Sequence, residues 1–408
     1  MLFRDIIGQE EVKQQLVELV QHNRLSHALL FSGKEGSGAL PLALTFAQYI
    51  GIRTSRPLAG AALFPDEATV QDKPGASATT VEQADVWMQQ QPAYSKVRDF
   101  VHPDIHFSYP VVTKKAGTPP ISTDYISDWR EFIKSYPYGN VYDWLQFIGA
   151  ENKQGNITAH ECNDIIRRLS LKSFESEYKL LVMWMPEYLG NEGNKLLKLI
   201  EEPPPNTIFI LVAENESLIL PTILSRCQLI KIPSLETKDI EEALVSRNKT
   251  EVQLARQAAS VSDGNYREAL QILRHAEEDW QSLLRDWLNA ILKTGPIAQT
   301  KWVEEISRLG REKQKQFLRY FNHLLGQAVR VRVMGNDETA LSNIPEKERD
   351  FADRLNKIAD LSQQQVIIEE LDKAAYYIER NANAKILFHA LTIKLYHIIQ
   401  DKFVFLTT

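Results

Sequence analysis

Cysteine is nearly absent from this sequence: its 408 residues contain only Cys162 and Cys227. Two cysteines cannot form a disulfide framework, and they cannot supply the four thiolates of a structural zinc site. We therefore expect both thiols to be reduced and the chain to carry no metal.

Long apolar runs and an excess of positive charge are also missing. No run approaches the roughly 20 apolar residues of a membrane span, and residues 1–5 lack the basic and apolar segments of a secretion signal. These absences predict a cytoplasmic protein with no membrane contact.

A net charge of -6 argues against strong independent binding of nucleic acid, which needs clustered Lys and Arg. Any contact with DNA is expected to be shared with partners.

Short apolar segments alternate with helical patterns through the first half of the chain. The expected strands are residues 28–31, 105–109, 180–184, 207–212 and 229–232. Helical patterns at 9–22 and 194–202 flank them, and this alternation favours an α/β fold with a parallel sheet covered by helices on both faces. From about residue 236 only helical periodicity continues, which predicts an all-α remainder.

The length of the chain predicts two or three domains. We expect a sheet domain at 1–233 with an insertion at about 51–155, a small helical lid at 234–280, and an all-α C-terminal domain at 281–408. Within the insertion, residues 51–100 have weak periodicity and predict an extended insertion or a partly mobile loop. The aromatic-rich residues 122–150 favour a packing surface at one edge of the sheet, with a ligand platform as the alternative.

A glycine-rich turn separates the first expected strand from a helix. It reads Gly33-Lys34-Glu35-Gly36-Ser37-Gly38-Ala39-Leu40. A phosphate-binding loop has the form G-x-x-x-x-G-K-[ST], in which Lys neutralises the phosphates and the hydroxyl helps to hold Mg²⁺. Ala39 and Leu40 replace both side chains, and Lys34 lies too early to substitute for the lysine. Gly33, Gly36, Ser37 and Gly38 are therefore candidates for a decayed phosphate loop that no longer supports catalysis.

The acidic pair of a P-loop ATPase is also missing. It should end the strand at 180–184, where it would bind Mg²⁺ and orient the attacking water. By position the pair is Trp184-Met185, and Glu187 comes two residues too late. Both halves of the catalytic site are lost while the apolar scaffold remains, which is the pattern expected of a degenerate ATPase.

Four blocks carry a resemblance to a known family. They are IIGQEEV (6–12), SHALLFSGKEGSG (26–38), NKLLKLIEEPP (194–204) and LPTILSRCQ (220–228). Together they cover about 230 N-terminal residues and resemble the AAA+ clamp-loader subunits of bacterial DNA polymerase III. A ruined phosphate loop with an intact Ser-Arg-Cys is most similar to the delta-prime branch. The resemblance implies an AAA+ P-loop-type sheet domain, a helical lid and an all-α collar.

The resemblance also implies a function. In that family the Ser-Arg-Cys lies at a subunit boundary, so Ser225-Arg226-Cys227 would present Arg226 as a trans-acting finger to the ATP of a neighbouring gamma/tau motor. Guanidinium is permanently charged and fork-shaped, which suits it to phosphoryl oxygens. The chain itself would need no cofactor, because partner subunits bind ATP and Mg²⁺.

The implied partners are the gamma/tau and delta subunits, with the sliding clamp and primed DNA reached through the complex. The implied assembly is the DNA polymerase III holoenzyme, a DNA-directed DNA polymerase (EC 2.7.7.7).

The chain departs from the family in the cysteine-free stretch 51–100, where many members insert a zinc knuckle. Arg267 resembles a second nucleotide sensor, but we expect it to pack against acidic neighbours as a solvated helix residue. Two other functions stay open: an active gamma/tau-like AAA+ ATPase with an atypical site, and a stand-alone AAA+-like DNA-repair factor. The sequence also leaves open whether the amides of Gly33 to Gly38 still capture a nucleotide.

Overall fold

The protein is described by a computed structural model that covers residues 1–54, 80–114, 117–151, 153–274, 280–335, 346–379 and 382–402. The chain divides into two compact units, Met1–Leu273 and Arg274–Thr408. The first unit contains both the sheet and most of the helices predicted as a lid. The finer division at 233 and 280 stays a prediction.

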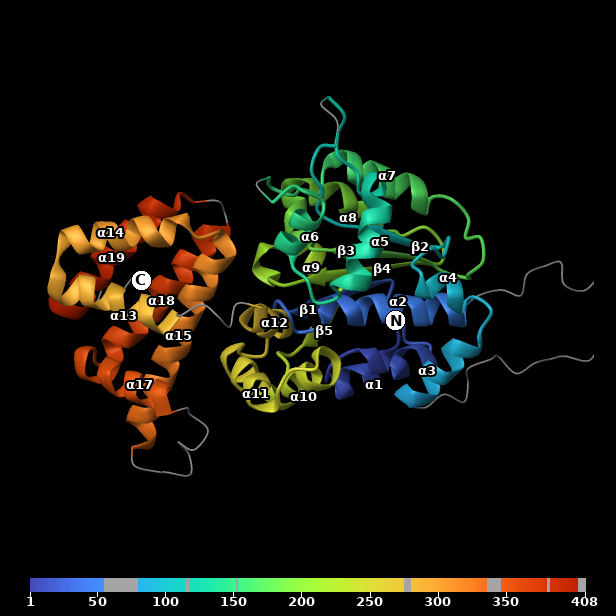
Figure 1. The fold of residues 1–408 in the computed structure, drawn as a ribbon. Coiled ribbons are helices and arrows are strands. Elements are labelled where there is room, and N and C mark those ends of the chain that lie inside the picture. Colours follow the sequence, from blue (N-terminus) through green and yellow to red (C-terminus); the bar gives the residue numbers. More distant parts are fainter. Residues whose placement is uncertain are drawn as a thin grey trace, which may run out of the picture. The chain divides into compact units, whose positions relative to one another are not determined.

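The first unit is built on one five-stranded parallel sheet (Figure 1). Its strands are β1 (Ala28–Gly33), β2 (Ile105–Ser108), β3 (Lys179–Trp184), β4 (Thr207–Ala213) and β5 (Gln228–Ile232). Their order across the sheet is β2-β3-β4-β1-β5. Each strand lies where the apolar segments predicted it, so the expected α/β fold with a parallel sheet is confirmed.

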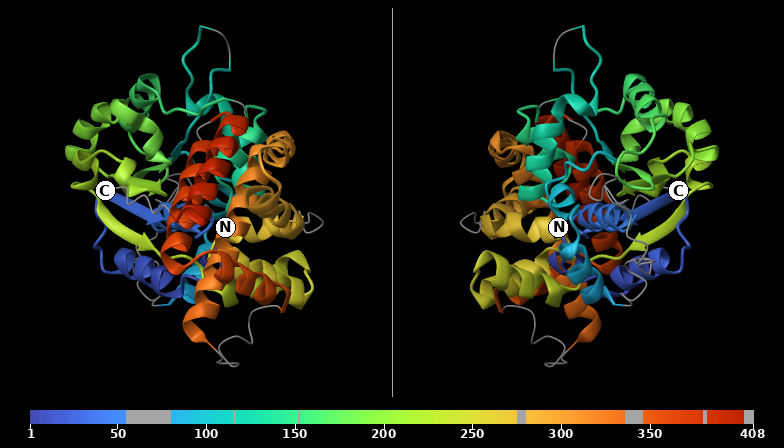
Figure 2. Two further views of the ribbon diagram at one scale, coloured as in Figure 1. Left: turned by 90° about the vertical axis from the view of Figure 1, so that its left-hand side faces the viewer. Right: turned by 90° about the vertical axis from the view of Figure 1, so that its right-hand side faces the viewer.

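Helices cover both faces of this sheet. One face packs on α1 (Glu10–Gln21), α2 (Ala39–Arg53), α3 (Val81–Gln90), α4 (Tyr94–Arg98), α5 (Ile126–Ser135) and α6 (Val141–Phe147). The opposite face packs on α7 (Ala159–Leu169), α8 (Asn194–Glu201) and α9 (Pro221–Leu224). In Figure 2 the blue α1 and the green α7–α9 lie on opposite sides of the strands.

Strand β3 shows why the sheet needs both layers. Leu180, Val182 and Trp184 point into the core formed with α2 and α5, whereas Leu181 and Met183 point into the core formed with α7 and α8. Side chains of a strand alternate between faces, so an apolar residue at every position requires cover on both sides.

The described residues of the stretch 51–100 are mostly helical, whereas the sequence predicts an extended insertion or a partly mobile loop. Helix α2 continues to Arg53, and α3 and α4 follow; residues 55–79 lie outside the described residues. Asp85 of α3 accepts hydrogen bonds from the N–H groups of Phe3 (2.8 Å) and Arg4 (2.9 Å). For residues 81–98 the prediction was wrong, because α3 is fixed by contacts with the N-terminal segment, which local periodicity does not reveal.

The aromatic-rich segment forms packing, as expected. Trp129 stacks on Tyr109 with ring centroids 4.1 Å apart, and Trp144 and Phe132 pack around it. All four side chains are buried. This aromatic cluster continues into the sheet through Trp184, whose ring lies 5.2 Å from that of Trp129.

Three helices follow β5 in the first unit, and the second unit is helical throughout its described residues. The three are α10 (Thr237–Asn248), α11 (Val252–Val261) and α12 (Tyr266–Arg274). The second unit contains α13 (Trp280–Asn289), a π-helical turn (Ala290–Thr294), α14 (Pro296–Arg308), α15 (Arg311–Met334), α17 (Glu346–Ile358), α18 (Leu361–Glu379) and α19 (Ala384–Gln400).

The core of the second unit centres on Trp287, which stacks on Trp302 and donates to Thr392 (3.0 Å). The predicted all-α C-terminal region is confirmed. Among the described residues, no helix is both long and apolar enough to cross a membrane.

Candidate functional site

The glycine-rich turn lies where β1 ends and α2 begins. Gly36 and Gly38 have φ angles of +73° and +94°, in the left-handed region that favours glycine. A Cβ on Gly36 would also lie 1.9 Å from Oδ1 of Asn265. The chain therefore needs these glycines for its own backbone and packing, and the frame of a phosphate loop is preserved.

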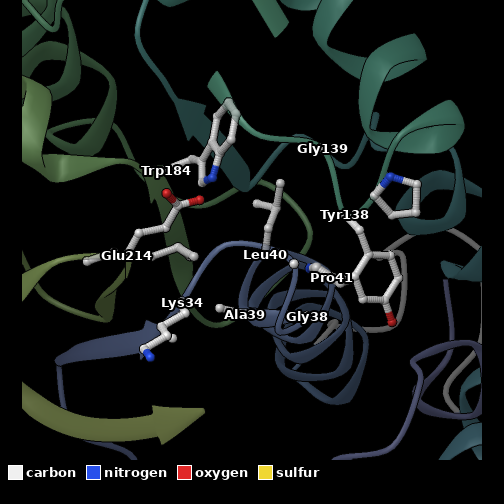
Figure 3. Close-up of a pocket in the computed structure, with 14 residues that line it drawn as sticks. Lys34, Gly38, Ala39, Leu40, Pro41, Tyr138, Gly139, Trp184 and Glu214 are labelled. Carbon is white, nitrogen blue, oxygen red and sulfur yellow. The ribbon is translucent and has the colours of Figure 1, made fainter. Parts of the chain in front are cut away.

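A small cavity of about 20 Å³ adjoins this turn, which is room for one or two water molecules. Leu40, Trp184, Tyr138 and Glu214 are among the residues that line it (Figure 3). Figure 3 shows the amine of Lys34 pointing away from Leu40 and Trp184. Ala39 and Leu40 take the places of the loop's lysine and of its Ser or Thr hydroxyl, and the hydroxyl of Tyr138 accepts from the N–H of Ile7 (2.8 Å). These residues therefore do not fit a reacting Mg–ATP complex.

The two residues at the position of the missing acidic pair, Trp184 and Met185, are buried in the core. Trp184 is buried in the aromatic cluster, and Met185 beside it is also buried. Glu187 instead accepts hydrogen bonds at Oε1 from the N–H groups of Glu214 (2.7 Å) and Asn215 (2.9 Å). Burial raises the pKa of this carboxyl. Glu187 therefore ties the turn after β3 to the turn after β4.

Polar side chains from two other segments converge on Glu35 in the turn. Its Oε2 accepts from Nδ2 of Asn140 (2.9 Å), and its Oε1 accepts from Nδ2 of Asn265 (3.0 Å) and Nη1 of Arg267 (3.4 Å). Arg267 also donates hydrogen bonds to the carboxylate of Asp143 through Nε (2.5 Å) and Nη2 (2.7 Å). We call these five residues the Glu35 network; it fastens α12 and the start of α6 to the glycine-rich turn.

Arg267 contacts acidic residues, as expected, but the prediction that it is solvated was wrong. Only 4% of its side chain is exposed. A buried guanidinium needs compensating charge and hydrogen bonds, and the two carboxylates of Asp143 and Glu35 supply them. Sequence reasoning missed the other members of the network. The local sequence indicates that Asn140 and Asp143 form a helix-capping pair. It does not indicate that they contact residues 35 and 267.

The Ser225-Arg226-Cys227 segment joins α9 to β5. Ser225 and Arg226 are exposed, while burial raises the pKa of the half-buried Cys227 thiol to about 11. Nη1 of Arg226 donates to the carbonyl oxygen of Thr222 (2.7 Å) and to Oγ of Ser225 (3.2 Å). Its Nη2 forms an ion pair with Glu201, the last residue of α8, which sequence reasoning also left without a role.

The two predicted sites lie at opposite ends of the sheet. Strands β1 and β5 are parallel, with Leu29 opposite Gln228 and Gly33 opposite Ile232. Arg226 therefore precedes the amino end of β5, whereas the glycine-rich turn follows the carboxyl end of β1. At about 3.3 Å per residue, β5 alone separates them by roughly 13 Å. The fold does not bring Arg226 to this chain's own turn.

The described residues contain no group of three or more His, Cys, Asp or Glu side chains arranged to hold a metal ion. The absence of zinc stays a prediction.

The family model described as DNA polymerase III, delta subunit, matches residues 8–236, more than half of the chain. The chain belongs to this family. It is 26% identical over 270 residues to the delta' subunit of Bacillus subtilis DNA polymerase III, a match covering 66% of this chain and 60% of the relative. The resemblance to a delta-prime-like clamp-loader subunit is thereby confirmed.

Two further similar proteins carry names that refer to DNA polymerase III. The tau subunit of Bacillus subtilis is 24% identical over 336 residues, covering 80% of this chain and 46% of the relative. A solved structure of a gamma subunit-related protein from Thermotoga maritima has 12% identity and a TM-score of 0.33, with 96% of this chain and 99% of that chain covered. The chain thus spans 60% or less of the length of the two curated relatives.

Proposed function

We propose that this chain is a non-hydrolysing subunit of a clamp-loader complex and that Arg226 acts in trans on ATP bound by a neighbouring gamma/tau motor. One observation carries the proposal. The nucleotide site of the chain is apolar at its catalytic positions, while an exposed arginine in the family's Ser-Arg-Cys lies at the opposite end of the sheet.

The loss of hydrolysis follows from the chemistry of the site. A P-loop ATPase needs a lysine on the β/γ-phosphates and oxygen ligands for Mg²⁺. Ala39, Leu40, Trp184 and Met185 occupy those positions, and all four are buried apolar side chains. The charge that develops on a transferring phosphoryl group would meet no countercharge from them. ATP and Mg²⁺ are then held by the partner subunits.

The trans role rests on the position and exposure of Arg226. Its guanidinium stays charged at any physiological pH, and 36% of the side chain is exposed. It follows a single-turn helix at the sheet's amino end, where a second subunit can reach it. The proposed partners are gamma/tau and delta, and the sliding clamp and primed DNA are reached through the whole complex.

The test is a reconstituted complex of wild-type motor subunits with either form of this chain. Arg226→Ala should leave assembly intact by gel filtration. It should cut ATP turnover at the facing motor site by about a thousandfold or more, as removal of an arginine finger does. Total turnover falls only in part because other motor sites do not face this chain. Arg226→Lys should not restore the rate, since an ammonium cannot reproduce the planar fork.

Arg256→Ala is a matched control, because Arg256 is also an exposed arginine paired with one glutamate. Full turnover by an assembled Arg226→Ala complex would refute the trans role. ATPase activity in the purified chain alone, abolished by substitutions in residues 33–40, would instead favour the active-ATPase alternative.

A further inference from the structure

The guanidinium of Arg226 is held from two directions. Its own turn supplies the carbonyl oxygen of Thr222 and Oγ of Ser225, and a second element, α8, supplies the carboxylate of Glu201. We propose that Glu201 is a positioning residue that orients Arg226 toward the partner's phosphate. This inference rests on the trans role proposed above and deepens it.

The donors of Arg226 divide between this chain and a prospective partner. A guanidinium has five N–H donors. Nη1 donates to Thr222 and Ser225, and Nη2 forms an ion pair with Glu201. In the described parts of the chain no acceptor contacts Nε–H. This donor therefore remains available to the oxygens of a phosphoryl group.

Glu201 supplies an anchor that the local turn cannot supply. Thr222 and Ser225 lie within four residues of Arg226 and would move with it if the turn shifted. Glu201 lies on α8, whose Leu196 and Ile200 are buried against the sheet. A long, flexible side chain loses conformational freedom when it is ordered, and an existing ion pair removes part of that loss before the partner binds.

The carboxylate need not leave for a phosphate to bind. Because Nε–H has no acceptor in the described parts of the chain, the guanidinium can bridge the carboxylate and a phosphoryl group at once. Both side chains of the pair are exposed, at 36% and 42%, so solvent screens the repulsion between Glu201 and an approaching phosphate. Orientation is therefore the larger effect, and loss of Glu201 should slow the reaction.

The experiment measures the Arg226-dependent part of the ATPase rate, taken as the wild-type rate minus that of Arg226→Ala in the reconstituted complex. Exposed ion pairs are weak, so Glu201→Ala should lower this part by about two- to fivefold. The KM for ATP should stay unchanged, because the motor subunit binds the nucleotide. Glu201→Gln should retain more activity than Glu201→Ala, since its amide oxygen keeps a polar contact beside Nη2. In the Arg226→Ala background, Glu201→Ala should cause no further loss.

Glu202→Ala is the matched control. Glu202 is the next residue, is exposed, and its N–H continues the helix by donating to Lys198, so its substitution should leave the rate unchanged. A wild-type or faster rate with Glu201→Ala would overturn the positioning role. So would an equal loss with Glu202→Ala, or a further loss in the double variant. A normal rate with Arg226→Ala would remove the trans role and this inference together, whereas a slow Arg226→Ala with a normal Glu201→Ala would remove this inference alone.

Discussion

Two arginines of this chain occupy contrasting environments. Arg267 is 4% exposed and is gripped by Asp143 and Glu35, which come from segments far apart in the sequence. Arg226 is 36% exposed and pairs with one glutamate that is itself half in solvent. Both guanidinium groups have acidic partners. Arg226, unlike the buried Arg267, has an exposed guanidinium, so charge beside the glycine-rich turn supports the fold and charge at the opposite end of the sheet is accessible to another molecule.

The energies of the two pairs differ accordingly. An exposed ion pair contributes about 0 to 1 kcal/mol, because solvent screens it and both side chains lose freedom. Removing one partner from a buried pair costs about 3 to 5 kcal/mol, because a charge is left unpaired away from water. The same substitution at residues 226 and 267 should therefore separate an effect on a partner from an effect on folding.

The largest effect on stability is expected at the buried arginine. Arg267→Met should lower the free energy of unfolding by about 3 to 5 kcal/mol, because Asp143 and Glu35 lose their shared cation. Denaturant titration of the purified chain measures this change. Arg226→Ala in the same assay should stay within about 1 kcal/mol of wild type.

A triple variant distinguishes the effect of unpaired charge from the effect of lost packing. Combining Arg267→Met with Asp143→Asn and Glu35→Gln removes the charges together, and most of the lost stability should return. If the triple variant is as unstable as Arg267→Met, the loss reflects packing of the arginine stem and not unpaired charge.

An intermediate effect is expected where α12 meets the glycine-rich turn. Gly36→Ala places a Cβ in left-handed backbone and against Asn265, and should cost about 2 to 4 kcal/mol. Gly149→Ala is the control, because Gly149 also has positive φ (+67°) but has open space around its Cβ position. It should cost about 1 kcal/mol. If thermal or denaturant unfolding shows that both variants lose the same stability, a clash between the new Cβ and Asn265 does not contribute to the loss.

The smallest effect is expected from repairing the loop sequence. Ala39→Lys with Leu40→Thr restores the letters of a phosphate loop, but Trp184 and Met185 still supply no acid for Mg²⁺ or for the attacking water. ATP turnover by the purified double variant should stay at background in a phosphate-release assay. Turnover well above background would show that the site needs only the two loop side chains. That result would contradict the account in which both the phosphate loop and the acidic pair have been lost.

The sequence was informative where structure depends on local pattern. Apolar segments located all five strands. The spacing of the motifs alone predicted that residues 39, 40 and 184 replace the catalytic side chains of a P-loop ATPase. Helix α3 was missed because its fixed position depends on Asp85 meeting the backbone of residues 3 and 4. The partners of Arg267 and Arg226 were missed for the same reason: contacts between residues 35, 143 and 267, or between 201 and 226, leave no periodic signal.

The most direct test of the contrast between the two arginines is the ATPase rate per assembled complex with Arg226→Ala or Arg267→Lys in this chain. Both are measured below the melting temperature of the variant chain, after gel filtration has shown equal assembly. Arg226→Ala should slow turnover and weaken clamp loading. Arg267→Lys should leave the rate per complex unchanged, because that cation serves the fold of its own subunit. The account would be contradicted by a wild-type rate with Arg226→Ala, or by an equal loss from the two variants.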